Sequence, residues 1–172
     1  MTLPVTMVIA ITGAAIASAF DIKIRKIPNW LTFSMIFLGL ILNSYEHGLT
    51  GFEQSFMGFG LGIFCLFLPF TLGGVGAGDV KLLGALGSLM GPVLIFKIVL
   101  VSALFGGLFS LIFIIGKKTA KKVFVEIRNK VTFFILTKKV LPEKLDSGQK
   151  LSIPYACAIA MGTVLVVLVL RG

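Results

Sequence analysis

The chain of 172 residues is too apolar for an ordinary soluble domain: 57% of its residues are hydrophobic and its mean hydropathy is +1.05. Soluble domains are roughly 45–50% apolar. Lipid explains the excess, because membrane-spanning segments are apolar on all sides. The net charge of +9 does not indicate nucleic acid, since the lysines gather between apolar runs rather than along one face of a compact domain.

Six apolar runs follow one another along the chain. They cover residues 3–20, 30–44, 54–72, 80–91, 93–115 and 153–170. Because a spanning helix needs about 20 residues, the pattern predicts an all-α polytopic membrane protein of about six transmembrane helices, folded as a single domain over residues 1–172. The first basic residue, Lys23, follows the first run instead of preceding it, which favours a retained span over a cleaved signal peptide.

The distribution of basic residues predicts the orientation in the membrane. All but two of the 16 Lys and Arg residues lie after the first run, at the start of the fourth, or between the fifth and sixth. If six spans alternate, these connections share one side, which the excess of positive charge marks as cytoplasmic. We therefore expect a multi-pass protein of the inner (plasma) membrane whose two termini lie outside.

The longest connection, residues 117–150, is predicted to be a basic cytoplasmic loop. Val123, Ile127, Val131 and Phe134 recur in it at helical spacing among lysines. This pattern indicates a basic amphipathic helix on the inner leaflet, in contact with membrane lipid. A partly disordered basic loop is the alternative, because the periodicity is weak.

The sequence gives no support for a metal, a cofactor or a nucleic-acid partner. Cys65 and Cys157 lie inside apolar runs and form no CxxC pair, so neither a zinc site nor a disulfide framework is expected. The glycine string before Asp79 is followed by neither Lys-Ser nor Lys-Thr, and the aspartate would repel phosphate, so no nucleotide site is expected.

Two of the seven carboxylates, Asp21 and Asp79, are the candidates for chemistry. Each stands where a long apolar run meets a short polar turn, and ionisable groups in such places are costly and usually functional. The other five fall in or beside expected loops or surface: Glu46, Glu53, Glu126, Glu143 and Asp146. Charge counting places both aspartates on the cytoplasmic side without any assumption about them.

Each aspartate also has a simpler interpretation. Asp21 can pair with Lys23 or Arg25 in an exposed turn, where ion pairs are common and weak. Asp79 can cap the short helix expected to start near it. Capping does not prevent catalysis, and the glycines before Asp79 would let an extended peptide lie beside its carboxylate.

Together the two aspartates suit peptide hydrolysis. Two carboxyls at close range share a proton, because both cannot ionise cheaply. The ionised one can then draw a proton from water while the protonated one donates to the scissile carbonyl. The single histidine, His47, is expected on the outer side, which excludes a Ser-His-Asp triad with these aspartates, and no HExxH motif occurs.

The two aspartate segments resemble the paired signatures of the type IV prepilin peptidases. They are Asp21 with Arg25-Lys26-Ile27-Pro28-Asn29-Trp30-Leu31-Thr32, and Gly76-Ala77-Gly78-Asp79-Val80-Lys81-Leu82. Ile153-Pro154-Tyr155 with residues 158–162 is similar to the family's late Ile-Pro-aromatic segment. The resemblance covers nearly the whole chain and is nearest to the short peptidases of tight-adherence pili and to archaeal preflagellin peptidases.

This resemblance implies a six-span GxGD aspartyl protease that cuts the short basic leader from pilin-like precursors, after a glycine at the cytoplasmic membrane face. Asp21 and Asp79 would be its catalytic pair. The substrate-binding or site-supporting residues would be Gly76, Gly78, Lys81, Pro28 and Asn29. The implied partners are a prepilin or preflagellin precursor, membrane lipid and pilus assembly machinery. Longer bacterial members carry an N-terminal domain with paired CxxC zinc ligands, linked to N-methylation; the chain has neither, so no methyltransferase activity is expected.

Two other classes of function remain open from the residues alone. A non-catalytic membrane subunit or a small ion-coupled transporter would use the aspartates to bind a cation or a proton. Transporters more often place such carboxylates near the bilayer midplane, whereas both stand here at the ends of spans. An interaction protein would use the basic segment 117–150 to bind anionic lipid or an assembly ATPase.

Overall fold

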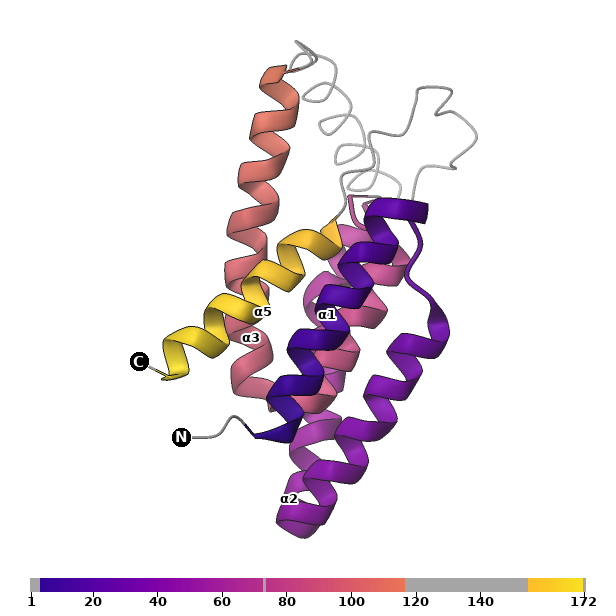
Figure 1. The fold of residues 1–172 in the computed structure, drawn as a ribbon, viewed down its shortest axis with the longest axis vertical. Coiled ribbons are helices and arrows are strands. Elements are labelled where there is room, and N and C mark those ends of the chain that lie inside the picture. The colour runs from indigo at the N-terminus through magenta and orange to yellow at the C-terminus, as the bar shows by residue number, and fades with distance from the viewer. Residues whose placement is uncertain (1–3, 73, 117–154, 172) are drawn as a thin grey trace, which may run out of the picture.

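The computed structural model describes residues 4–72, 74–116 and 155–171, and every regular element within these ranges is an α-helix (Figure 1). The helices are α1 (Val5–Ile24), α2 (Asn29–Thr71), α3 (Ala77–Gly116) and α5 (Tyr155–Arg171). The all-α prediction is confirmed for these residues. The amphipathic helix predicted within 117–150 lies outside them.

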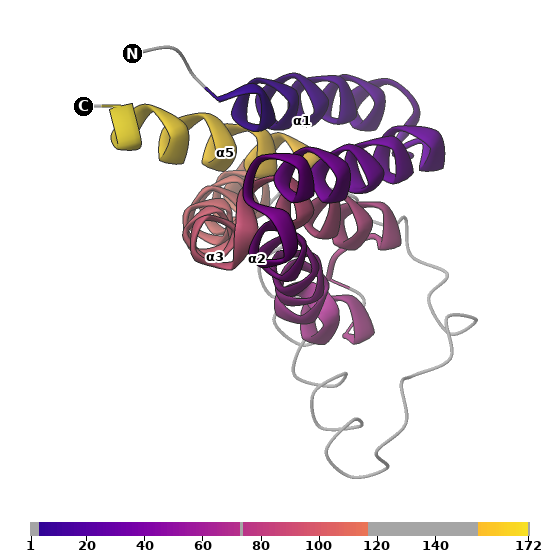
Figure 2. The same ribbon diagram turned by 90° about the horizontal axis from the view of Figure 1, so that it is seen from below.

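Glycines break α2 and α3 into two arms each. Gly48 has φ 64° and ψ −139°, and Gly91 has φ 76° and ψ 174°, in the region of backbone space that favours glycine. Pro92 follows Gly91 and has no N–H to continue the helix. Both helices fold back at these breaks, as the two views show (Figures 1 and 2). The breaks separate runs that the sequence analysis had treated as distinct.

Within the described ranges, three helical stretches are long and apolar enough to cross a membrane. They are α1, α2 and the part Ala77–Ser110 of α3, whereas α5 is a shorter apolar helix. Large apolar side chains cover their outer surfaces, with Phe64 75% exposed and Leu104 74% exposed, as expected where lipid replaces water. The count of six spans stays a prediction, because length and composition identify three.

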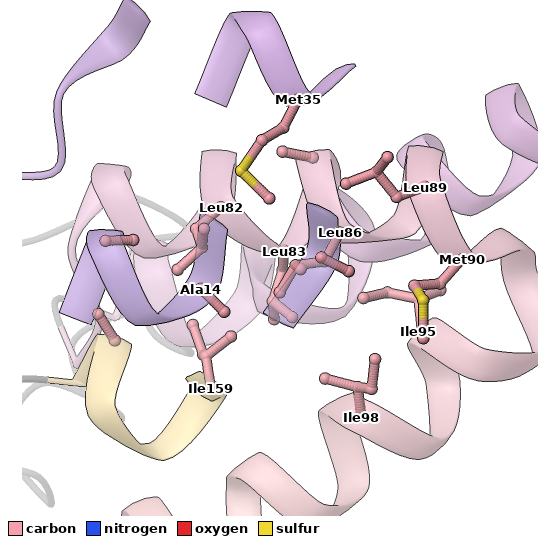
Figure 3. Close-up of a cluster of buried hydrophobic side chains, with 14 of the residues drawn as sticks. Ala14, Met35, Leu82, Leu83, Leu86, Leu89, Met90, Ile95, Ile98 and Ile159 are labelled. Atoms are coloured by element: carbon pink, nitrogen blue, oxygen red, sulfur yellow. The ribbon is translucent and has the colours of Figure 1, made fainter. Parts of the chain in front are cut away.

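The first arm of α3 is the centre of the bundle. Residues 82–91 are all buried, and α3 contacts each of the other three helices. Figure 3 shows leucines of this arm meeting side chains from α1, α2 and α5, among them Leu82, Leu83, Leu86, Ala14, Met35 and Ile159. The start of this arm therefore lies where the other helices converge.

The second arm of α2 packs backbone to backbone on the first arm of α3. A Cβ added at Gly58 would overlap the carbonyl of Gly87, and one added at Gly87 would overlap the carbonyl of Gly58. A Cβ at Gly62 would overlap the carbonyl of Leu83 in the same way. Small residues allow this close approach, which is a common way for helices to associate in membranes.

A polar network joins the two arms of α2 to α3. Asn43 Nδ2 donates to Ser55 Oγ at 2.8 Å and to the carbonyl oxygen of Ser88 at 3.0 Å. Ser55 Oγ in turn donates to the carbonyl of Gly39 at 3.2 Å. In an unbroken helix the Ser88 carbonyl would accept from residue 92, but Pro92 has no N–H. Asn43 therefore supplies the donor that the proline removes.

Candidate active site

Asp21 lies in the last turn of α1, where the sequence analysis had expected a turn outside the helix. The helix continues to Ile24 and ends at Arg25, which adopts the left-handed conformation (φ 52°, ψ 33°) and donates its N–H to the Asp21 carbonyl at 2.9 Å. A single carboxylate does not stop a helix, whereas a left-handed residue does. The Asp21 side chain is half-buried, and its Oδ2 accepts from the backbone N–H of Ala156 at 3.4 Å.

Asp79 lies in the first turn of α3 and caps that helix. Its Oδ2 accepts from the backbone N–H of Gly76 at 3.2 Å, and its own N–H donates to the Gly76 carbonyl at 3.1 Å. This is half of a capping box, in which an acidic side chain three residues into a helix satisfies a free N–H before it. The capping role expected for Asp79 is confirmed.

Capping uses only one of the two Asp79 oxygens. Asp79 is 8% exposed, and its buried Oδ1 accepts a hydrogen bond from no residue that the structure describes. Burial of a polar atom without a partner costs free energy, so such atoms are rare and are often functional. Asp21 lies in the last turn of α1 and Asp79 in the first turn of α3, and the residues beside them meet where Gly78 faces Ile27. The two carboxyl groups therefore lie at the same end of the bundle.

Two direct contacts join the segments that carry the aspartates. Lys81 Nζ on α3 donates to Asn29 Oδ1 at the start of α2, at 3.0 Å. Gly78 faces Ile27 so closely that an added Cβ would lie 3.2 Å from the Ile27 Cβ. Three of the five predicted supporting residues therefore take part in these contacts. Lys81 itself lies inside α3, not in a turn before it.

The other two supporting residues shape the backbone around the aspartates. Pro28 (φ −63°, ψ 133°) occupies the cap position with an extended backbone, so α2 begins at Asn29, one residue after the proline that was expected to start the helix. A Cβ at Gly76 would lie 3.2 Å from Oδ2 of Asp79. A side chain at position 76 would therefore crowd the capping oxygen.

Two neighbours of the aspartates come from α5 and were given no role from the sequence. Ala156 contributes only its main-chain N–H, which no side-chain pattern can reveal. Tyr155 lies near enough to Asp79 for that charge to act on its phenol group. In the sequence, only the similarity of residues 153–155 to a family segment pointed to this region, and that similarity predicted no contact with the aspartates.

The two glutamates and the histidine of α2 lie far from this site. Glu46, His47 and Glu53 are exposed around the break at Gly48. The arm from Asn29 to His47 is about 28 Å long at about 1.5 Å per residue, so His47 cannot join the aspartates in a triad. Among the described residues, no three His, Cys, Asp or Glu side chains gather as ligands for a metal.

Comparison with known proteins gives a family for the chain. The sequence profile of the type IV leader peptidase family matches residues 8–111, which include both aspartates. A preflagellin peptidase of Methanocaldococcus jannaschii is 39% identical over 92 residues, which are 50% of this chain and 38% of that protein. A preflagellin peptidase of Methanococcus voltae is 36% identical over 86 residues, 48% of this chain and 36% of that protein.

The aligned segments thus cover well under half the length of these two relatives, and no solved structure matches the chain. The family profile, in contrast, matches more than half of this chain and covers most of α1, all of α2 and most of α3. The chain belongs to the type IV leader peptidase family.

Proposed function

We propose that the protein is an intramembrane aspartyl endopeptidase that removes the short basic leader from type IV pilin-like precursors, prepilins or preflagellins, with Asp21 and Asp79 as its catalytic pair. Family membership and the two preflagellin peptidases support the reaction class. The observation that carries the proposal is that two carboxyls from different helices lie at one end of the bundle, and that Oδ1 of Asp79 is buried without a hydrogen-bond partner among the described residues.

The surroundings of the two carboxyls favour a division of labour. Asp79 is the more buried, so it holds the shared proton, because a buried charge is costly. Asp21 is half-buried, close to the charge of Arg25 and to the first turn of α5, where the helix dipole favours a negative group. Asp21 is therefore the base and Asp79 the acid.

Hydrolysis then needs no covalent intermediate. The Asp21 carboxylate takes a proton from water as the water oxygen attacks the scissile carbonyl carbon, and Asp79 donates its proton to the carbonyl oxygen. In the tetrahedral intermediate, Asp21 passes the proton to the leaving nitrogen. Asp79 takes back the hydroxyl proton as the C–N bond breaks, which restores both groups.

The ends of the helices support a site at the cytoplasmic face. Lys23, Arg25 and Lys26 are exposed directly after Asp21, and such basic residues stay on the cytoplasmic side of a membrane. A precursor whose apolar helix lies in the bilayer would then present its leader at the level of the aspartates. Membrane lipid and pilus assembly machinery are the further partners in this proposal, with residues 117–150 as the segment that contacts them.

Co-expression with candidate prepilins or preflagellins, followed by the mass of the product's N-terminus, tests the proposal. The unaltered chain should release the leader, and Asp21→Asn and Asp79→Asn should leave the precursor intact while eluting as folded protein in detergent. Glu46→Gln and Glu53→Gln are matched controls, because these exposed carboxylates lie around the break in α2. Cleavage by either aspartate variant would contradict the proposal. Proton or cation flux in liposomes without any cleavage would favour the transporter alternative.

A further inference from the structure

The first turn of α5 lies against the end of α1 that carries Asp21. Ala156 donates its backbone N–H to Asp21 Oδ2 at 3.4 Å. One turn earlier on α1, Ser18 Oγ donates to Cys157 Sγ at 3.1 Å. The first N–H groups of a helix have no partner within it, so Asp21 caps α5 from another helix. The two contacts together fix how this turn is rotated against α1.

Tyr155, the first residue of α5, holds the same turn against α3. Its ring lies on Gly106 so closely that a Cβ at position 106 would come within 2.5 Å of the ring atom Cε2. The side chain is half-buried and packs against the hydrophobic core. The ring therefore contacts the second arm of α3, while Asp79 lies near it at the start of the first arm.

We propose that Tyr155 is a positioning residue of the peptidase site: its ring, seated on Gly106, fixes the first turn of α5, and Ala156 in that turn holds the Asp21 carboxylate beside Asp79. The inference rests on the peptidase function proposed above and adds α5 to the two helices that carry the carboxyl groups. Figures 1 and 2 both place α5 beside α1, as this arrangement requires.

Without the ring, the first turn of α5 loses its contact with Gly106 of α3. The Ala156 N–H then moves relative to Asp21. A displacement of about 1 Å in a catalytic arrangement can lower the rate about 100-fold. The loss falls on kcat, because the ring orients the carboxylates. A residue needed only for stability would instead lower the yield of folded enzyme and leave the kcat of the folded fraction unchanged.

Kinetics of purified variants on one precursor give the first test. Tyr155→Ala should lower kcat about 10- to 100-fold with little change in KM, and Tyr155→Phe, which keeps the ring, should recover most of that rate. Gly106→Ala should act like Tyr155→Ala, because its methyl group displaces the ring. Gly107→Ala is the matched control, since nothing lies within 4 Å of its added Cβ. In a Tyr155→Ala background, Gly106→Ala should have no further effect.

A second measurement needs no cleavage. In a Cys65→Ser chain, maleimide labelling of Cys157 reports how firmly the first turn of α5 is held, because Cys157 Sγ is the acceptor of Ser18. Labelling should be faster in Tyr155→Ala and in Gly106→Ala than in the parent. Unchanged labelling, a parental kcat in Tyr155→Ala, or an equal effect of Gly106→Ala in both backgrounds would overturn the inference. A parent that cleaves no precursor would contradict the peptidase assignment instead, and the labelling would still decide on the positioning.

Discussion

Lys81 Nζ and Asn29 Oδ1 are joined by a hydrogen bond of 3.0 Å that connects the starts of α3 and α2 across 52 positions of sequence. Each residue belongs to one of the two motifs that carry the aspartates. Both side chains are exposed, so the bond joins the two segments at the surface without filling the core. It is a direct polar contact between the second motif and the first.

Loss of this bond should lower cleavage modestly. Lys81→Met and Asn29→Ala are each expected to reduce kcat/KM about fivefold or less, because an exposed charge-assisted contact is weak. The double variant should be no worse than the poorer single variant, since both remove the same bond. Cleavage assays on the four chains measure this, with the exposed Lys97→Met as control. Fully additive losses would show that the two side chains act separately.

The capping oxygen of Asp79 should be sensitive to the residue at position 76. Gly76→Ala places a Cβ 3.2 Å from Asp79 Oδ2, tighter than an ordinary contact, so the carboxyl must shift. We expect kcat to fall about tenfold, because small displacements of catalytic groups are costly. The neighbouring Gly74→Ala serves as control, since its Cβ would meet the Pro69 carbonyl at an ordinary 3.4 Å. Equal rates for the two variants would argue against this account.

The close packing of α2 on α3 predicts that alanine is tolerated differently at two glycines on opposite faces of α2. Gly58→Ala should destabilise the protein by about 1–3 kcal/mol, because its methyl group overlaps the Gly87 carbonyl and the helices must separate. Gly60→Ala should cause no loss, since its Cβ meets nothing within 4 Å. Thermal unfolding in detergent compares them. A Tm for Gly58→Ala as high as that of Gly60→Ala would contradict the packing.

The donor that Asn43 supplies to the Ser88 carbonyl gives a second stability prediction. Asn43→Leu keeps the approximate volume but leaves that carbonyl without a donor, because Pro92 cannot provide one. The free energy of unfolding should fall by about 1–3 kcal/mol. Ser44→Ala is the control, as the Ser44 hydroxyl donates to the Leu40 carbonyl of its own helix. Thermal unfolding in detergent should therefore give a lower Tm for Asn43→Leu than for Ser44→Ala.

The sequence predicted the parts of this site that depend on rare residue types. Carboxylates are scarce in an apolar chain, so Asp21 and Asp79 were identifiable without a structure, and periodicity was enough for the helical class. Helix ends were less predictable. Asp21 was expected in a turn, yet α1 continues past it, because the left-handed Arg25 ends the helix. The catalytic role of the pair stays a proposal.

Contacts between distant segments could not be predicted from the residues alone. Asn29 and Lys81 were both named as supporting residues, but their bond depends on how α2 and α3 pack. The contribution of Ala156 is a main-chain N–H, which any residue except proline can offer. The connection between the second and third apolar runs was expected to be a loop, but only Gly48 departs from helical geometry there, so the helix continues on both sides of it.

Cross-linking in membranes measures most directly whether the two carboxyls meet. In a chain with Cys65→Ser and Cys157→Ser, Asp21→Cys and Asp79→Cys would be combined and treated with a short bifunctional thiol reagent. Asn29→Cys with Lys81→Cys is the positive control, because these side chains touch, and Asp21→Cys with Glu53→Cys is the negative control. The account predicts an intramolecular link between positions 21 and 79, detected by mass after proteolysis. A positive control that links while the 21–79 pair does not would contradict it.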